Sequence, residues 1–191
     1  MSGGILFFSL NNLLYIEIMI KLFKIIILIY LLNGYVYTKQ SEVETSFLSV
    51  TFNGSVPKKQ RLIVKGEAKD QIKSIMGNKY KKRLFSYWRN VAQQVWILNS
   101  IGKYKPITAA FSIQNCSVKS AHVLVYREQH GYEIKYPFFL TQFTDAKIDS
   151  ALKLDTKIDN ISAATLSVNS MKRMAKMALL LSKLSNENSC T

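Results

Sequence analysis

Alternating apolar residues in the middle of the chain constrain the fold more than any other feature. Residues 107–113 and 118–126 each repeat with a period of two, and residues 91–98 contain a third apolar run. Such runs are typical of β-strands with one face turned to a core. Turn residues at 99–103 and 114–117 separate the three segments. Short connections between successive strands predict antiparallel pairing, so we expect a β-meander.

Helical periodicity lies on both sides of this meander. Residues 67–76 place apolar side chains three and four positions apart, and Gly77 follows as a candidate C-cap. A second helix is predicted near the C-terminus, where the apolar positions are Val168, Met171, Met174, Ala175, Ala178, Leu179 and Leu181. An antiparallel meander with packed helices defines an α+β domain. Residues 47–52 alternate weakly and are a candidate for one more strand. For the aromatic cluster Phe138, Phe139 and Phe143, core packing is favoured over a stacking role.

Composition excludes several chemistries. The two cysteines cannot build a four-thiolate metal site, and the sequence contains no H-E-x-x-H pair, phosphate-binding Gly-Lys-Ser/Thr loop or G-x-G-x-x-G fingerprint. The chain has 26 Lys and Arg against 12 Asp and Glu, a net charge of +14. Such a balance favours anionic partners such as nucleic acid, phosphate ligands or lipid headgroups, and the alternative is a soluble domain that is simply basic. The basic run at 79–83 is typical of a solvated face, with contact to a phosphate or a membrane surface as the alternative.

Residues 1–38 differ from the rest and are predicted to be a signal peptide or an N-terminal anchor. From Met19 onward, two lysines precede the apolar run 25–32 and a polar break at 33–34, which is the order of a secretory signal. Met19 is therefore a candidate true start, with Val36 and Thr38 near a candidate cleavage site. We expect the domain to act outside the cytoplasm, in the periplasm or anchored facing it.

Export would place both cysteines in an oxidising compartment, where Cys116 and Cys190 could pair. Because Cys190 lies beside the last residue, where chains fray, the sequence favours unpaired thiols instead. Residues 185–191 are polar and are expected to form a flexible tail.

Small and hydroxyl residues open the last predicted helix. Ser162 and Ser167 are candidate N-caps. A helix start presents backbone N–H groups without intrahelical partners and the positive end of the helix dipole, so it suits a phosphate. The candidate binding residues are Asp159, Ser162, Ala163, Ala164, Thr165, Leu166 and Ser167.

This segment resembles the attachment motif of the FMN-binding domain family, found in the flavinylated subunits of sodium-pumping NADH:quinone reductase and of the Rnf complex. The family motif is Asp, two variable residues, Ser or Thr, Gly, Ala, then Thr or Ser. Asp159, Ser162, Ala164 and Thr165 match it, whereas Ala163 stands where the family usually has glycine. The resemblance covers residues 91–184, and residues 39–90 are expected to be an N-terminal α/β extension.

The resemblance implies that Thr165 carries FMN through a phosphoester, attached by a separate magnesium-dependent transferase that uses FAD. It implies that the transferase reads Asp159 and Ser162. It further implies an electron carrier, rather than an enzyme with its own substrate, working between membrane-bound or haem-containing redox partners. Because Ala163 replaces the glycine of the family motif, the fallback to covalent attachment is a protein that binds flavin non-covalently or carries none. The alternatives are a basic extracytoplasmic binding or structural module of the same fold without flavin and, least favoured because of export, a nucleic-acid binder.

Overall fold

The computed structural model describes the backbone of residues 3–185 and the side chains of residues 17–31 and 41–185. Contacts divide the chain into two units, with the division between Ser46 and Phe47. Most of the predicted tail at 185–191 and the side chains at the candidate cleavage site, Val36 and Thr38, lie outside the described residues.

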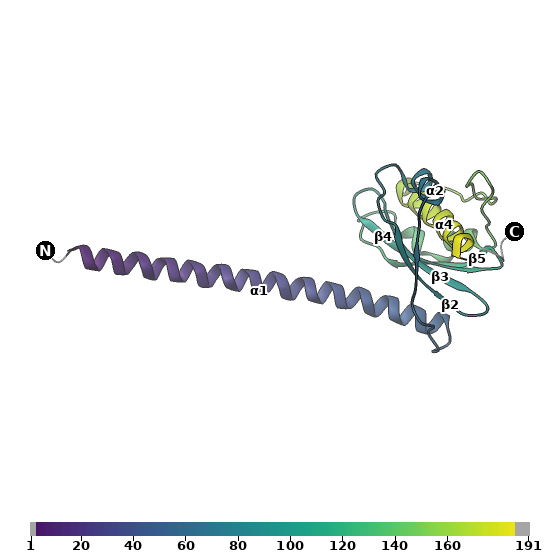
Figure 1. Cartoon of the computed structure of the whole chain (residues 1–191). Helices are drawn as coiled ribbons and strands as arrows, with labels where there is room; N and C mark the ends of the chain where they lie inside the picture. Colours follow the sequence, from purple (N-terminus) through teal and green to yellow (C-terminus); the bar gives the residue numbers. More distant parts are fainter. Residues whose placement is uncertain (1–2, 186–191) are drawn as a thin grey trace. The chain divides into compact units, whose positions relative to one another are not determined.

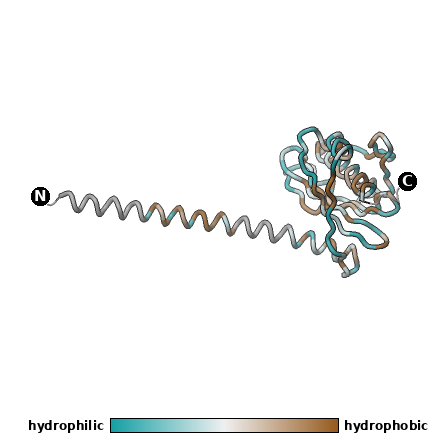
Figure 2. The backbone as a smooth tube through the Cα atoms, in the orientation of Figure 1, coloured by the Kyte–Doolittle hydropathy of each residue, from teal (hydrophilic) through white to brown (hydrophobic). Residues whose placement is uncertain are grey.

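The first unit is formed by helix α1 (Gly3–Thr51), whose last turns belong to the second unit (Figure 1). Its described side chains between Ile18 and Leu31 include many large apolar groups, and these are exposed. Figure 2 colours the backbone of this stretch by its hydropathy. Over the part of the chain whose side chains are described, no helix combines the length and apolarity needed to cross a membrane.

The second unit is built on one antiparallel sheet whose strands follow chain order, which confirms the predicted α+β meander (Figure 1). The strands are β1 (Gln60–Ile63), β2 (Leu84–Arg89), β3 (Gln94–Ile101), β4 (Pro106–Gln114) and β5 (Ser117–Val125). Neither β1 nor β2 was predicted. In β2, Phe85 and Tyr87 face one side and Trp88 the other, and all three are buried. Because large residues occupy both faces, β2 lacks the polar alternation that marks a half-buried strand.

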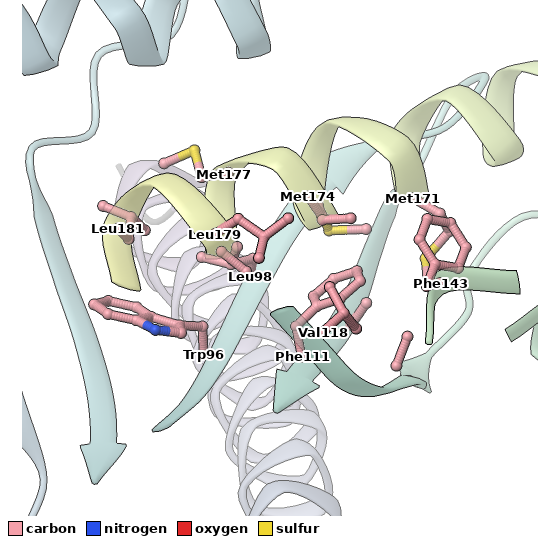
Figure 3. Close-up of a cluster of buried hydrophobic side chains, with 14 of the residues drawn as sticks. Trp96, Leu98, Phe111, Val118, Phe143, Met171, Met174, Met177, Leu179 and Leu181 are labelled. Carbon is pink, nitrogen blue, oxygen red and sulfur yellow. The ribbon is translucent and has the colours of Figure 1, made fainter. Parts of the chain in front are cut away.

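Helices cover the inner face of the sheet. Helix α2 (Glu67–Met76) ends at Gly77 as predicted, where the Gly77 N–H donates to the Lys73 carbonyl at 2.8 Å. Helix α4 (Thr165–Ser185) packs on β3 and β4, and all its predicted apolar positions are buried. Figure 3 shows Met174 and Leu181 of α4 facing Phe111 and Trp96 of the sheet. Burying side chains of this size stabilises the fold by roughly 1.5–3 kcal/mol each.

The predicted strand at 47–52 is wrong, because this segment is the end of α1 and the turn after it. The Thr51 hydroxyl donates to the Phe47 carbonyl four residues earlier, at 2.8 Å. Leu48 and Phe52, also four residues apart, pack against Trp88 and Val95 on the outer face of the sheet. In a helix, residues four apart are neighbours on one side, so Leu48 and Phe52 contact the same patch of the sheet. In a strand the two residues would also share a face, but they would lie much farther apart.

Between β5 and α4 run three short helical segments: η1 (Tyr132–Lys135), α3 (Pro137–Leu140) and η2 (Thr141–Phe143). Phe139 and Phe143 are buried as expected and meet edge to face, with ring centroids 5.4 Å apart. Phe138 is exposed, so its expected place in the core is wrong. Successive residues of a helical turn point about 100° apart, and only one of this adjacent pair can face the core.

The expectation of unpaired thiols is also wrong for Cys116, which is disulfide-bonded. Cys116 lies in the β4–β5 turn, where Asn115 and Cys116 both adopt left-handed backbone conformations. Cys190, the other cysteine of the sequence, lies outside the described residues.

Candidate functional site

Thr165 is the first residue of α4, and its side chain is exposed. The Val168 N–H donates to the Ala164 carbonyl at 2.9 Å, which is the start of the helical hydrogen-bond pattern. The amides of residues 165–167 therefore precede that pattern and lack intrahelical acceptors. The Asn160 side-chain amide donates to Thr165 Oγ1 at 2.9 Å, which fixes the direction of the threonine hydroxyl.

A tight turn at 161–164 leads into the helix. The Ala164 N–H donates to the Ile161 carbonyl at 3.0 Å, and Ala163 has a φ of 61°. A left-handed residue at this place explains why glycine would suit it. Ala164 occupies the position before the first helical residue, so neither Ser162 nor Ser167 is the N-cap. The predicted caps are wrong because the left-handed turn moves the helix start between them.

A cavity of about 700 Å³ opens beside this helix start. Its wall consists of three short segments, residues 103–105 of the β3–β4 turn, residues 128–130 after β5, and residues 163–167. No two of these segments are close in sequence, and the sheet brings them together. The Thr165 hydroxyl thus stands at the edge of an open space and not in a sealed interior.

Glu128 holds the β3–β4 turn in place. Its Oε1 accepts the backbone N–H groups of Tyr104 at 2.7 Å and of Lys105 at 2.9 Å. Hydrogen bonds from backbone amides, first that of Lys105, lower the pKa of this carboxyl. Lys103 and Lys105 are exposed and contribute two cations to the cavity wall. An anion bound at the helix start would meet positive charge from both sides.

Tyr126 joins the segment after β5 to α4. Its hydroxyl donates its one proton to the His130 carbonyl at 2.5 Å. The hydroxyl oxygen also lies 3.1 Å from Ser167 Oγ, so in this second hydrogen bond Ser167 is the donor. Burial raises the pKa of Tyr126. Gly131 completes this contact, because an added Cβ there would lie 2.9 Å from the Ala164 Cβ. The helix start and the cavity wall are therefore one packed unit.

The cavity gathers five of the seven predicted residues: Ala163, Ala164, Thr165, Leu166 and Ser167. Asp159 and Ser162 are exposed and do not line it. The Asp159 N–H donates to Gln142 Oε1 at 2.7 Å, and its carboxylate lies 3.6 Å from the Lys157 ammonium group.

Sequence reasoning missed several residues of the site. Asn160 occupies a variable position of the motif, so the motif does not predict a role for it. Glu128 acts through backbone N–H groups of the β3–β4 turn, which is distant in sequence, and Tyr126 acts through the nearby His130 carbonyl and the Ser167 hydroxyl. The turn predicted at 99–103 marked only part of this wall. Among the residues with described side chains, no cluster of His, Cys, Asp or Glu is arranged to hold a metal ion.

A helix start flanked by lysines at an open cavity defines a site for a phosphate-bearing cofactor. The model of the FMN-binding domain family matches residues 102–180. The chain therefore contains an FMN-binding domain, and the match includes all three segments of the cavity wall. No curated protein matches the chain. The family points to FMN as the cofactor and to a flavin-binding role in electron transfer.

Proposed function

We propose that this protein is an exported electron-transfer flavoprotein that carries FMN on Thr165 through a phosphoester. The observation that carries the proposal is the exposed Thr165 hydroxyl at the mouth of the cavity, inside the segment matched by the family. The protein would act as a carrier and would have no substrate of its own.

The residues present fit such a group. A cavity of about 700 Å³ is within the roughly 300–1,000 Å³ of small-molecule sites. The amides at 165–167 and the ammonium groups of Lys103 and Lys105 supply donors for a phosphate. Tyr104 and Leu166 supply exposed apolar surface for a ring system. Bound FMN would supply the redox chemistry, and the chain would supply position and charge.

Attachment would join Thr165 Oγ1 to the FMN phosphorus of FAD. The bond that forms is the threonine O–P bond, and the bond that breaks is the pyrophosphate bond, so AMP leaves. The hydroxyl proton passes to a base of the transferase or to solvent. Asp159 and Ser162 lie exposed beside the cavity, which suits recognition by a separate enzyme.

The alanine at position 163 is compatible with this function. Ala163 already adopts the left-handed conformation that glycine would favour, at a cost of roughly 1–2 kcal/mol. The turn that presents Thr165 is therefore formed without glycine.

Location and partners form part of the same proposal. The disulfide at Cys116 supports an oxidising, extracytoplasmic compartment. The signal-like order of lysines and apolar residues after Met19 supports export. The net charge of +14 favours acidic redox partners, membrane-bound or haem-containing, and contact with an anionic membrane surface.

Co-expression with an FMN transferase tests the proposal. Intact mass spectrometry should find an increment equal to FMN less one water, and the yellow colour should stay with the denatured chain. Thr165→Ala should abolish the increment, and Thr165→Ser should retain it. Thr156→Ala, which changes an exposed threonine that lies outside the cavity wall, is the matched control and should behave like wild type.

An increment that persists in Thr165→Ala would overturn the threonine linkage. A chain that folds and gains neither covalent nor bound flavin would instead favour the flavin-free binding module.

A further inference from the structure

We propose that Arg173 and Arg127 are positioning residues that brace the tip of the β3–β4 hairpin and thereby hold the flavin ring in the FMN cavity. This inference rests on the function proposed above, because the hairpin tip supplies residues 103–105 of the cavity wall. Arg173 belongs to α4, the helix that begins at Thr165, and Arg127 follows the end of β5.

The β3–β4 hairpin extends beyond the neighbouring strands on both sides. Pairing of β2 with β3 ends at Trp96, and pairing of β4 with β5 ends at Thr108. Residues 97–107 therefore continue past both neighbours. Ile107 is fully buried, whereas Ile101, nearer the tip, is 61% exposed. Apolar packing thus holds the base of the hairpin, and the direction of the tip must be fixed by other contacts.

Two arginines donate to the last pair of the β3–β4 ladder, which is formed by Ile101 and Pro106. Arg173 Nη2 donates to the Ile101 carbonyl at 2.9 Å, and Arg127 Nη1 donates to the Pro106 carbonyl at 3.1 Å. The next pair toward the tip is joined by a hydrogen bond from the Gly102 N–H, at 3.1 Å. Because hydrogen-bonded pairs alternate along an antiparallel ladder, the carbonyls of Ile101 and Pro106 point out of the hairpin, where the arginines reach them.

Each arginine also contacts a hydroxyl group of the same strand. Arg173 Nε and Nη2 donate to Ser100 Oγ at 3.4 and 3.2 Å, and Arg127 Nη1 donates to Thr108 Oγ1 at 3.1 Å. Burial lowers the pKa of Arg173, so a cation placed here loses hydration free energy that these hydrogen bonds offset. A guanidinium presents its donors in a fixed plane, and it can therefore set the direction of a strand as well as its distance.

Arg173 links the two sides of the FMN cavity. It lies about two turns after Thr165 on the same helix, and Thr165 is the proposed attachment point of the phosphate. Its hydrogen bonds to β3 therefore fix the separation between that point and the hairpin tip. A flavin attached at Thr165 is then held against the tip in one orientation, whereas a tip free to swing would leave the ring loose.

Arg173→Met tests the inference in the full chain, because methionine keeps an apolar stem and removes every donor. In the flavin-free chain, hydrogen exchange at the Tyr104 and Lys105 amides should become about tenfold faster, which corresponds to a loss of about 1.4 kcal/mol. Exchange at the Leu98 amide, nearer the base, should not change. Arg173→Lys should restore part of the protection. Lys172→Met, which removes one cation from the preceding position of the same helix, is the matched control and should behave like wild type.

Co-expression with the FMN transferase gives a second measurement, on the flavin itself. Arg173→Met should keep the FMN mass increment, but the visible circular dichroism of the flavin should weaken and its fluorescence anisotropy should gain a fast decay. Arg173→Lys should recover part of both signals. Arg127→Met repeats the test from the β4 side of the hairpin and should give the same changes.

Unchanged amide exchange in Arg173→Met, or an equal change in Lys172→Met, would overturn the brace. Faster exchange with unchanged flavin signals would overturn its role in positioning the ring. A wild-type chain that gains no flavin would instead overturn the function proposed above and the positioning role with it. Because the exchange measurement needs no flavin, these failures are distinguishable.

Discussion

Asn160 holds the hydroxyl of Thr165: its side-chain Nδ2 donates to Thr165 Oγ1 at 2.9 Å, across a separation of five residues. Both residues are exposed, yet the bond spans the turn at 161–164 and ties the segment before the turn to the first residue of α4. The acceptor oxygen of the proposed phosphoester is therefore oriented before any transferase binds.

Asn160→Ala should slow flavin attachment without unfolding the domain. Loss of one hydrogen bond of about 1 kcal/mol corresponds to roughly a fivefold lower rate, because Thr165 would sample other rotamers. A time course of intact mass with transferase and FAD measures this rate. Asn160→Ser, which retains a short donor, should recover part of it. Equal rates for wild type and Asn160→Ala would show that the transferase orients Thr165 by itself.

Gly131→Ala should destabilise the domain by more than its backbone conformation alone explains. Gly131 has a φ of 83°, and an added Cβ would lie 2.9 Å from the Ala164 Cβ. Gly54 offers a matched control, because its φ is 81° and nothing lies within 4 Å of an added Cβ. Both substitutions incur the left-handed penalty, and only Gly131→Ala adds overpacking of about 1–3 kcal/mol. Denaturant unfolding of the two variants measures the difference, and equal losses would contradict a tight contact beneath the helix start.

Local periodicity was enough to predict α4 and the three central strands, because each buries one face along a regular repeat. It failed for Leu48 and Phe52, whose helical conformation is favoured by contacts with Trp88 and Val95, about forty residues away. It failed for β2 because both faces of that strand are buried. These elements depend on tertiary packing that overrides a weak local preference.

The candidate site also has one part that could be predicted from sequence and one part that could not. Thr165 and its neighbours form one continuous motif, and a motif can be read from sequence. The opposite wall comes from Lys103 to Lys105 and from Glu128, which meet only because β3, β4 and β5 pair in register. The role of Glu128 depends on accepting backbone N–H groups, and backbone groups leave no mark in a sequence.

Ala163→Gly should stabilise the protein by up to about 1 kcal/mol. The substitution removes the strain of an alanine at φ 61° and adds some entropy to the unfolded chain, so the gain is smaller than the full left-handed penalty. Ala163→Val should destabilise it, because a β-branched residue tolerates this conformation least. Denaturant midpoints give the order glycine, alanine, valine. A less stable glycine variant would mean that Ala163 makes contacts that outweigh its backbone strain.

Glu128 should make the stability of the cavity wall depend on acidic pH. Its folded-state pKa lies below the ordinary value of 4.5, first through the Lys105 amide, so below about pH 5 the unfolded chain binds the proton more readily than the folded one. The contribution of this carboxylate is complete above that range and is lost as pH falls through the folded-state pKa. Glu128→Gln should flatten this part of the profile and speed hydrogen exchange at the Tyr104 and Lys105 amides at neutral pH. Denaturant unfolding between pH 3 and pH 7, with amide exchange by NMR, measures both effects. A wild-type profile that Glu128→Gln leaves unchanged would show that the two amide bonds do not hold the β3–β4 turn against the cavity.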